Sequence, residues 1–208
     1  MWIIAGLGNP GSRYDGTRHN IGFELIDALG RQNGAMGYQN NFHADTDKIR
    51  LNGETVLLLK PNTFMNLSGK SVQAAAAFFK VKPENILVIH DDLDIPLGLM
   101  RVKKGGGHGG HNGLRDISAK LGNTYGRIRM GIGRPQHRGA EASFVLSRYD
   151  ASDLVKVEEQ IQASIVAIKK VIADGYEAAQ MDFNQKKKKK PEEPRESKPK
   201  PERLEGDT

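Results

Sequence analysis

Strand-like and helix-like hydrophobic patterns alternate along this chain. Apolar, β-branched runs predict strands at Trp2–Leu7, Phe42–Leu51, Thr55–Leu59, Ile86–His90, Gly98–Lys103 and Arg127–Gly133. Apolar residues at helical spacing predict helices at Ile21–Arg31, Leu67–Phe79, Gly113–Leu121 and Asp153–Ala173. Because the strands alternate with helices, and one short connection indicates a hairpin, we expect a single α/β domain. Its β-sheet should be mixed but mostly parallel, with helices on both faces.

The C-terminal part of the chain changes character after Phe183. We expect the last long helix to begin with a cap at Ser152-Asp153 and to end at Asp174-Gly175. The sequence that follows Phe183 has no aromatic residue, a single leucine and four prolines, so burial cannot offset its ordering entropy. The sequence therefore predicts a folded domain over residues 1–185 and a disordered Lys/Pro/Glu-rich tail over residues 186–208.

Composition narrows the class of protein without identifying a partner. The chain has 208 residues, a formal charge of +6 and no cysteine, which excludes disulfides and a cysteine nucleophile. Half of that charge lies in residues 186–208, which contain nine Lys/Arg and six Asp/Glu. No apolar run approaches the roughly 18 residues that span a bilayer, and the first one is expected to be a strand rather than a signal peptide.

The first loop, GLGNPGSRYDGTRHNIGF, is the most informative stretch of the sequence. Gly6, Gly8 and Gly11 match the GxGxxG pattern of dinucleotide-binding proteins. However, Pro10 precedes the third glycine, and the helical pattern begins only near Asn20, so no helix opens where a pyrophosphate would bind. We therefore interpret this segment as a catalytic or binding loop.

Unusual polar residues gather in four segments, each where a predicted element ends. They are Gly8–Asn20, Lys60–Gly69, His90–Pro96 and Lys103–Gly113. Loops held by a rigid sheet are where binding residues concentrate. The chain contains neither a GxSxG nucleophile elbow nor a Walker-type phosphate loop, since Phe64 stands where the first Walker glycine should be. Hydrolysis would therefore use water activated by a base.

Histidine suits that role near neutral pH, and His19 is the first candidate. Asp91 directly follows a predicted strand, so its carboxylate could orient the ring and stabilise the cation that forms. The sequence leaves open whether Asp91 acts alone or with Asp94. It also leaves open a structural alternative, in which His19 only caps or packs against the helix that begins near Asn20.

Asn9, Asn66 and Asn112 form a second group of candidates at loop–helix boundaries. Their amides could bind a peptide, but asparagine is also a good helix cap, so each has a purely structural alternative. The glycine-rich segment that precedes Asn112 could expose backbone N–H groups to a phosphate, with Lys103, Lys104 and Arg115 nearby. A metal site is a minor alternative, drawn from His90, Asp91, Asp92, Asp94, His108 and His111.

These segments together resemble the bacterial peptidyl-tRNA hydrolases. The motifs GLGNPG, YDGTRHNIGF, KPNTFMNLSGKS, HDDLDIPLGLMRVKKGGGHGGHNGLRDI and RIRMGIGRP occur in the family's order across residues 3–183. The resemblance implies hydrolysis of the ester between a peptide and the 3′ end of tRNA, which recycles peptidyl-tRNA. It also implies a cytoplasmic monomer that needs no metal or organic cofactor.

The resemblance also implies roles for individual residues. His19 would be the general base, Asp91 would support its basic form, and Asn9 would help distinguish a blocked peptidyl group from a free amine. Lys103 and Arg129 would hold an acceptor-stem phosphate. The substrate's peptidyl and terminal-nucleotide end would contact Tyr14, Phe64, Asn66 and Asn112.

Two further expectations concern partners. The alternative function is a non-catalytic RNA-binding member of the same fold, although the candidate base and the asparagines are all present in this chain. The basic tail lies outside the family's common pattern. Lys186–Lys190 is either part of a solvated extension or a source of long-range attraction to tRNA or to the ribosome.

Overall fold

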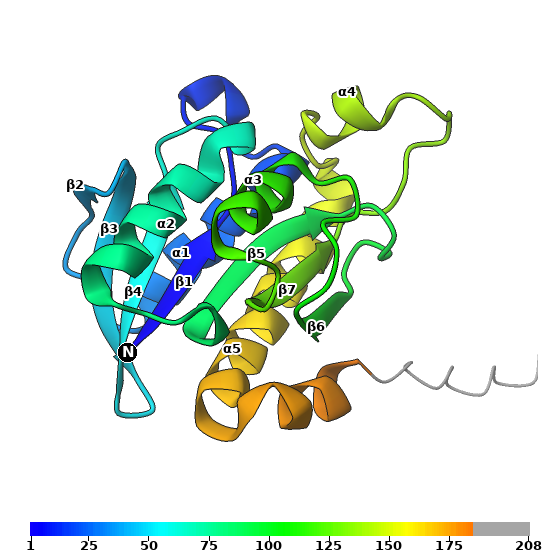
Figure 1. The fold of residues 1–208 in the computed structure, drawn as a ribbon. Coiled ribbons are helices and arrows are strands. Elements are labelled where there is room, and N and C mark those ends of the chain that lie inside the picture. The colour runs from blue at the N-terminus through cyan, green and yellow to red at the C-terminus, as the bar shows by residue number, and fades with distance from the viewer. Residues whose placement is uncertain (185–208) are drawn as a thin grey trace, which may run out of the picture.

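The computed structural model describes residues 1–184, which form three layers around one sheet (Figure 1). The seven strands are ordered β2-β3-β4-β1-β5-β7-β6. They are β1 (Trp2–Gly6), β2 (Gln39–Asn41), β3 (Ala44–Leu51), β4 (Glu54–Pro61), β5 (Ile86–Asp92), β6 (Met100–Lys104) and β7 (Gly126–Gly131). Strands β4, β1, β5 and β7 are parallel neighbours, and only β3 and β6 run against the others. The predicted mixed, mostly parallel sheet is confirmed.

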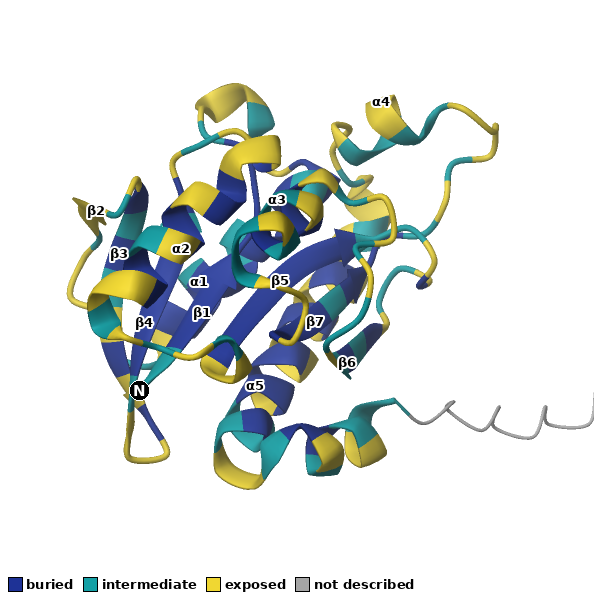
Figure 2. Cartoon of the chain, viewed as in Figure 1, coloured by how far each residue is buried: buried dark blue, intermediate teal, exposed yellow. Residues whose placement is uncertain are grey.

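Helices cover both faces of this sheet, as predicted. The helices are α1 (Ile21–Gln32), α2 (Ser68–Phe79), α3 (Asn112–Leu121), α4 (Glu141–Val145) and α5 (Leu154–Phe183). Helices α1 and α5 pack on one face, and α2 and α3 pack on the other. Adjacent β1 residues serve both cores, since Ile4 faces α1 and α5 while Ile3 and Ala5 face α2 and α3. The central strands are accordingly the most deeply buried elements (Figure 2).

The predicted elements all occur, and apart from the end of the last helix their ends differ by at most two residues. Two elements were not predicted, namely β2 and α4. All three residues of β2 are exposed, and α4 has no buried residue. Because neither element buries an apolar stripe, neither leaves the periodic signal on which the prediction depends.

The last helix extends beyond its predicted end. Helical residues continue past Gly175 to Phe183, although Gly175 itself has φ +87° and interrupts the helix. The glycine therefore marks a kink rather than the end of the element. Lys170 lies within ion-pair distance of Asp174 (2.9 Å), before the kink, and of Asp182 (3.3 Å), beyond it. Asp153 occupies the N-cap position of α5, but its side chain makes no capping hydrogen bond.

The GxGxxG-like glycines have a packing role. A Cβ on Gly6 would lie 2.2 Å from the backbone oxygen of Gly22 in α1, and a Cβ on Gly8 would lie 2.8 Å from the Phe23 ring. Gly22 is equally constrained, because its Cβ would lie 2.4 Å from the backbone nitrogen of Leu7. The glycines thus let α1 approach the end of β1, which places the segment just before α1 at the carboxyl edge of the sheet.

The predicted tail at residues 186–208, and hence the proposed domain boundary, lies outside the described residues. No helix within residues 1–184 is long and apolar enough to cross a membrane.

Candidate active site

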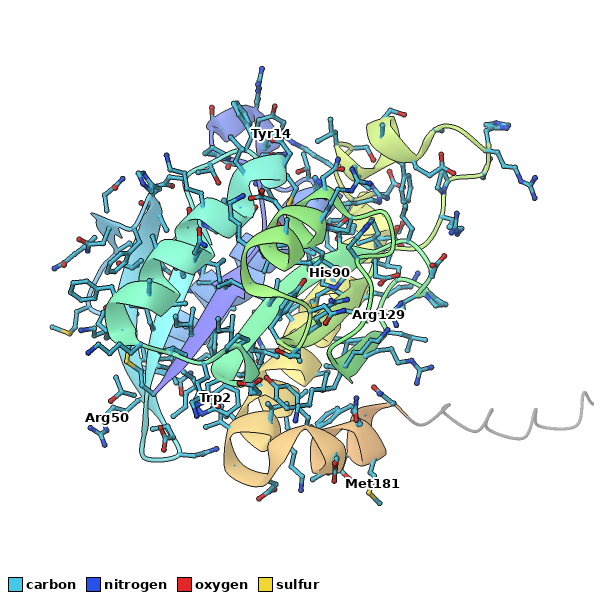
Figure 3. All side chains as sticks on the ribbon, in the orientation of Figure 1. Trp2, Tyr14, Arg50, His90, Arg129 and Met181 are labelled. Carbon is cyan, nitrogen blue, oxygen red and sulfur yellow. The ribbon has the colours of Figure 1, made fainter. Side chains whose placement is uncertain are left out.

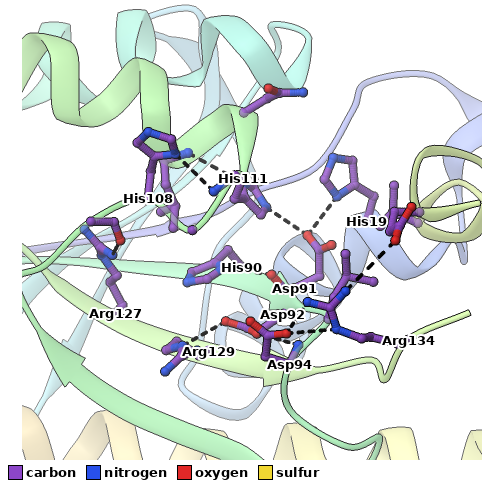
Figure 4. A pocket seen from close by; sticks show the side chains of 18 of the residues that line it. His19, His90, Asp91, Asp92, Asp94, His108, His111, Arg127, Arg129 and Arg134 are labelled. Carbon is purple, nitrogen blue, oxygen red and sulfur yellow. Dashed lines mark hydrogen bonds and ion pairs between the residues drawn. The ribbon is translucent and has the colours of Figure 1, made fainter. Parts of the chain in front are cut away.

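A pocket of about 440 Å³ opens at the carboxyl edge of β5. It contains five of the nine residues that the sequence analysis assigned to catalysis or substrate binding, namely His19, Asp91, Lys103, Asn112 and Arg129. This is where open α/β sheets usually bind ligands, because loops that follow parallel strands meet there. Figure 4 shows that side chains from three of the four polar segments line it.

Two histidines converge on one carboxylate oxygen at the centre of this pocket. His19 Nδ1 lies 2.8 Å from Asp91 Oδ1, and His111 Nε2 lies 2.9 Å from the same atom (Figure 4). The side chain of Asp91 is only 3% exposed, whereas that of His19 is 12% exposed. His19 is held in a 3₁₀ turn at Arg18–Asn20. The turn places the ring above the end of β5.

The hydrogen bonds determine which ring nitrogens carry protons. His111 is the N-cap of α3, and its Nδ1 accepts hydrogen bonds from the backbone N–H groups of Gly113 and Leu114. Its proton must therefore be on Nε2, which donates to Asp91. Since Asp91 accepts, His19 donates from Nδ1 as well. The lone pair of a neutral His19 is then on Nε2, which has no hydrogen-bond partner within residues 1–184.

Electrostatics keep Asp91 ionised. Burial by itself raises the pKa of this carboxyl group, but the charges and hydrogen bonds of His19 and His111 together lower the pKa below its ordinary value. Asp91 can therefore stabilise a positive charge that develops on His19. Asp94 does not share this role, because it is bound by Arg134 at 2.9 Å and faces solvent. Of the two carboxylates, Asp91 is the one that contacts His19.

His90 lies behind this group and is fully enclosed. Its Nδ1–H donates to the backbone oxygen of Asp91 at 2.8 Å, and its Nε2 is buried without a partner. Burial, and then the neighbouring His111, lower the pKa of His90 to about 3. His90 is therefore neutral at physiological pH and supports the backbone of Asp91.

Lys103, Arg127 and Arg129 also line the pocket, and they belong to a cationic face of the sheet. Antiparallel pairing of β6 and β7 sets Lys103 opposite Arg127 and Arg101 opposite Arg129, so all four side chains share one face of the sheet. Arg129 Nε donates to Asp92 at 2.8 Å, while its side chain remains 29% exposed. Like charges directly opposite each other destabilise a sheet, which is a cost that an anionic ligand would offset.

Buried Arg127 holds the glycine-rich loop against this face. Its guanidinium donates to the backbone oxygens of Gly106 and Gly107. The loop begins after Lys104, which pairs with Gly126, the first residue of β7. It ends at His111, whose side chain bonds Asp91. It therefore runs the length of the strand. Gly106 has φ +99°, and a Cβ there would lie 2.8 Å from the Lys103 ammonium.

Four predicted residues do not line the pocket. Asn9 links two loops. Its Oδ1 accepts a hydrogen bond from the Met65 N–H at 2.8 Å. Its backbone N–H donates to the Asn20 side-chain oxygen, and its backbone oxygen accepts from the Asn20 side-chain NH₂. Asn66 and Phe64 are exposed on the second of these loops. Tyr14 is well separated from His90 and Arg129 (Figure 3). These residues flank the pocket rather than forming its wall.

The helix-cap alternatives for Asn66, Asn112 and His19 are wrong, whereas the Asn9 side chain does accept from the first N–H group of the 3₁₀ turn at Met65–Leu67. His111, not Asn112, caps α3 through its side chain, and the Asn112 amide oxygen instead accepts from Arg115 at 3.1 Å. Asn66 lies inside a 3₁₀ turn and provides no cap for α2. The N-cap position of α1 belongs to Asn20, and the His19 side chain bonds Asp91.

A short helix closes the remaining side of the pocket. Glu141, Ala142 and Val145 of α4 line it. Arg18, the residue before His19, stacks on Phe144 of this helix at 4.6 Å and donates to Ser147 at 2.9 Å. The segment that carries α4 is thus tied directly to the turn that carries His19.

The set of metal ligands that the sequence suggested does not come together as a group. Within residues 1–184, the group with ligand-like spacing is His19, Asp91 and His111, whose atoms lie within 4.8 Å of one another. Their hydrogen bonds to each other and to α3 already use these atoms. The expectation that the site works without a metal or cofactor remains a prediction.

Sequence reasoning missed His111, Arg127 and α4 as parts of the site. His111 appeared only among metal ligands, and no spacing rule links it to His19, since a long glycine-rich loop brings them together. Arg127 looked like an ordinary strand residue. The signal that was available is the position of His111 next to Asn112, within the same polar segment.

Comparison with known proteins agrees with this geometry. Residues 3–192 match the family model described as peptidyl-tRNA hydrolase. The peptidyl-tRNA hydrolase of Haemophilus influenzae is 46% identical over 185 residues, covering 88% of this chain and 95% of that protein. That of Marinomonas is 46% identical, covering 85% and 92%. The crystal structure of peptidyl-tRNA hydrolase from Acinetobacter baumannii superimposes with a TM-score of 0.84 and 38% identity, covering 88% of this chain and 94% of that one.

Proposed function

The chain belongs to the peptidyl-tRNA hydrolase family, and we propose that His19 is the general base of its reaction. The protein hydrolyses the ester bond between a peptide and the 3′ end of tRNA, which recycles peptidyl-tRNA released during translation. The observation that carries the base assignment is the 2.8 Å contact of His19 Nδ1 with Asp91, which leaves Nε2 unpartnered among the described residues of the pocket.

In this mechanism, His19 Nε2 takes a proton from water as the oxygen attacks the ester carbonyl. Asp91 stabilises the imidazolium through the hydrogen bond to Nδ1. When the tetrahedral intermediate collapses, the bond to the ribose oxygen breaks and His19 returns the proton to it. The products are a peptide carboxylate and a free 3′ end. A positioned base of this kind contributes about 10²–10⁴-fold.

We assign the substrate's peptidyl end to the residues that flank the pocket. The Asn9 amide is fixed by Met65, which favours a role in distinguishing a blocked peptidyl group from a free amine. Asn112 lines the pocket beside His111 and offers an amide to the ester region. Tyr14, Phe64 and Asn66 are proposed to contact the peptide and the terminal nucleotide.

Lys103 and Arg129 are proposed to bind a phosphate of the acceptor stem. Both line the same pocket as His19, and both lie on the cationic face of β6 and β7. Phosphate contacts position a nucleic acid without reading its sequence, which suits an enzyme that accepts many tRNAs.

Several wider properties belong to the same proposal. We propose that the enzyme needs no metal or organic cofactor, works as a monomer in the cytoplasm, and has residues 1–185 as its catalytic domain. Contact of the basic tail with the ribosome is proposed from the five lysines alone. The alternative of a non-catalytic RNA-binding protein is disfavoured, because the compared relatives are hydrolases and His19 and Asp91 are paired here.

The test is release of an N-blocked amino acid from blocked aminoacyl-tRNA, with unblocked aminoacyl-tRNA measured in parallel. We expect rapid release from the blocked substrate only, and a loss of about 10²–10⁴-fold in His19→Ala with tRNA binding retained. His137→Ala is the matched control, since His137 is exposed and does not line the pocket. Equal loss in both variants, or full activity of His19→Ala, would reject the base assignment.

A further inference from the structure

Arg18, the residue before His19, is a buried cation without a counter-ion. It is 7% exposed, and none of the ion pairs within residues 1–184 involves it. Its Nε is buried and has no hydrogen-bond partner among the same residues. Burial of a charge is costly, and an apolar side chain in its place is often neutral or stabilising. Stability alone therefore does not account for an arginine at this position.

The guanidinium of Arg18 contacts the segment that carries α4. It donates to Ser147 Oγ at 2.9 Å and to the backbone oxygen of Arg148. Its Cζ lies 4.6 Å from the centre of the Phe144 ring and 4.9 Å from that of the Tyr149 ring. Phe144 belongs to α4, whereas Tyr149 packs against the core on the face of α1 and α5. Arg18 thus joins α4 to a residue that the core already holds.

The main chain of the same turn also pairs with this segment. The Arg18 N–H donates to the backbone oxygen of Ser147 at 3.0 Å, and Thr17 forms an isolated antiparallel bridge with Arg148. These main-chain contacts fix where the segment meets the turn. The guanidinium reaches further, to Phe144, and so holds α4 itself.

An exposed ion pair is the other link between α4 and the pocket that concerns us. None of the five residues of α4 is buried, and the helix projects from the body of the molecule (Figure 1). Arg134 Nε donates to Asp94 at 2.9 Å, and Arg134 lies 4.0 Å from Glu141 of α4. These side chains are exposed, so water and salt screen their attraction. The buried contacts of Arg18 should therefore contribute more to the position of α4.

The turn that contains Arg18 also carries the proposed base. His19 follows directly, and its Nδ1 lies 2.8 Å from Asp91. Asn20, the last residue of the turn, exchanges hydrogen bonds with the backbone of Asn9. Successive side chains of the turn thus bond different parts of the structure. Such anchoring matters for a base, because a misplacement of about 1 Å can cost about 10²-fold in rate.

We propose that Arg18 is a positioning residue for the hydrolysis. It holds the His19 turn and the α4 wall of the pocket together, so that His19 Nε2 and α4 meet the substrate in a fixed relation. This inference rests on the proposed function, because it takes His19 as the base. Arg18 does not line the pocket, so it acts through His19 on one side and through Phe144 on the other.

A purely structural role for Arg18 is the rival explanation. It predicts that a substitution lowers the free energy of unfolding and leaves kcat of the folded protein unchanged. The proposal predicts the reverse for Arg18→Met. Methionine keeps much of the apolar stem and removes the buried charge, and the acceptors that it leaves belong to Ser147 and Arg148, which are exposed to water.

The experiment compares Arg18→Met and Arg18→Lys with the unmodified full-length protein. It measures kcat and KM for release of an N-blocked amino acid from blocked aminoacyl-tRNA, binding of deacylated tRNA, and urea unfolding. Arg31→Met is the matched control, since Arg31 is exposed on α1 and does not line the pocket. Proton NMR follows His19 Nδ1–H, which is identified as the hydrogen-bonded resonance that His19→Ala lacks.

We expect Arg18→Met to lower kcat about 10–100-fold, with tRNA affinity within about twofold of the parent and a similar unfolding midpoint. Arg18→Lys keeps the charge and a donor but not the planar stacking, so it should lose less than about tenfold. The His19 resonance should shift or broaden in Arg18→Met and stay unchanged in Arg31→Met. Unchanged kcat in Arg18→Met, or a lowered kcat with an unchanged His19 resonance, would overturn the proposal.

Phe144→Leu tests the same link from the side of α4, and it serves equally where Arg18→Met does not fold. We expect Phe144→Leu to lower kcat about 3–10-fold, and to add little to the loss in Arg18→Met, because both changes remove one contact. Full activity of Phe144→Leu, or additive losses, would contradict the proposal. A failure of the hydrolase assignment is seen separately, as absence of ester cleavage by the unmodified protein.

Discussion

His111 and His19 donate hydrogen bonds to the same oxygen of Asp91, at 2.9 and 2.8 Å. His111 is held from the other side by the first turn of α3, whose N–H groups occupy its Nδ1. In this arrangement the His111 ring accepts through Nδ1 and donates through Nε2. Its role is to fix the Asp91 carboxylate in the position from which His19 is oriented.

Substitution of His111 should separate its two roles. An asparagine at this position would keep an oxygen near the place of Nδ1 and still cap α3, but it could not reach Asp91. We expect His111→Asn to retain stability to within about 0.5 kcal/mol and to lose about 5–50-fold in kcat. His111→Ala should show the same kinetic loss and an added loss of about 1 kcal/mol from the missing cap. Kinetics and urea unfolding measure both, and full activity of His111→Asn would contradict this role.

Replacement of Asp91 by asparagine should impair catalysis more than folding. The amide oxygen can still accept the histidine donors, but the neutral side chain has no negative charge with which to stabilise an imidazolium. We expect kcat to fall about 10²–10⁴-fold. In His19→Ala, the same change should cost little more, because the two residues act as a unit. Additive losses in the double variant would show that Asp91 acts independently of His19.

Asn9 offers a matched pair of variants. Asn9→Asp keeps an oxygen that can accept from the Met65 N–H, whereas Asn9→Ala leaves that buried donor unpaired. We expect a loss of about 1–3 kcal/mol in unfolding free energy for Asn9→Ala and a smaller loss for Asn9→Asp. Both should lower the preference for blocked over unblocked aminoacyl-tRNA. An unchanged preference in Asn9→Asp would remove Asn9 from substrate discrimination.

Glu24 should make stability depend on pH. Burial, then Asp27 and Glu158, raise the pKa of this carboxyl group from 4.5 to about 7. The folded state therefore binds a proton that the unfolded state has released between these values, so stability falls as pH rises from about 4.5 to 7. We expect Glu24→Gln to be more stable than the parent at pH 8, by on the order of 1–3 kcal/mol.

The measurement for Glu24 is thermal or urea unfolding at pH 5 and pH 8. The difference between Glu24→Gln and the parent should be small at pH 5, where Glu24 is protonated, and larger at pH 8. Glu177→Gln, at an exposed site on α5, serves as the control for loss of one charge. Equal differences at the two pH values would show that Glu24 ionises normally in the folded protein.

Gly6→Ala tests the packing of α1 on β1. The new Cβ would lie 2.2 Å from the backbone oxygen of Gly22, which cannot move without displacing the helix. We expect a loss of at least about 3 kcal/mol. Gly107→Ala, where a Cβ meets no atom within 4 Å, should change the unfolding free energy by less than about 1 kcal/mol. Similar unfolding midpoints for the two variants would contradict the packing role.

The sequence by itself determined the order and type of the main elements. Apolar runs such as Ile86–His90 and the helical stripe at Ile21–Arg31 are local patterns, and each is decided within one element. The motifs also contained the residues that meet in the pocket. The exposed β2 and α4 left no such pattern, and Gly175 was interpreted as an end because a local rule cannot tell a kink from a stop.

Only the tertiary structure decided which polar residues share an atom or a face. His19 and His111 are 92 positions apart in the sequence. The glycine-rich loop that leads to His111 has no periodicity from which its path could be predicted. Lys103 and Arg127 became neighbours through strand register, and Asn184 reached Val102 only because α5 turns back beneath the sheet. Hydrogen bonds and charge pairs act over a few ångströms in space, whereas the sequence records only separation along the chain.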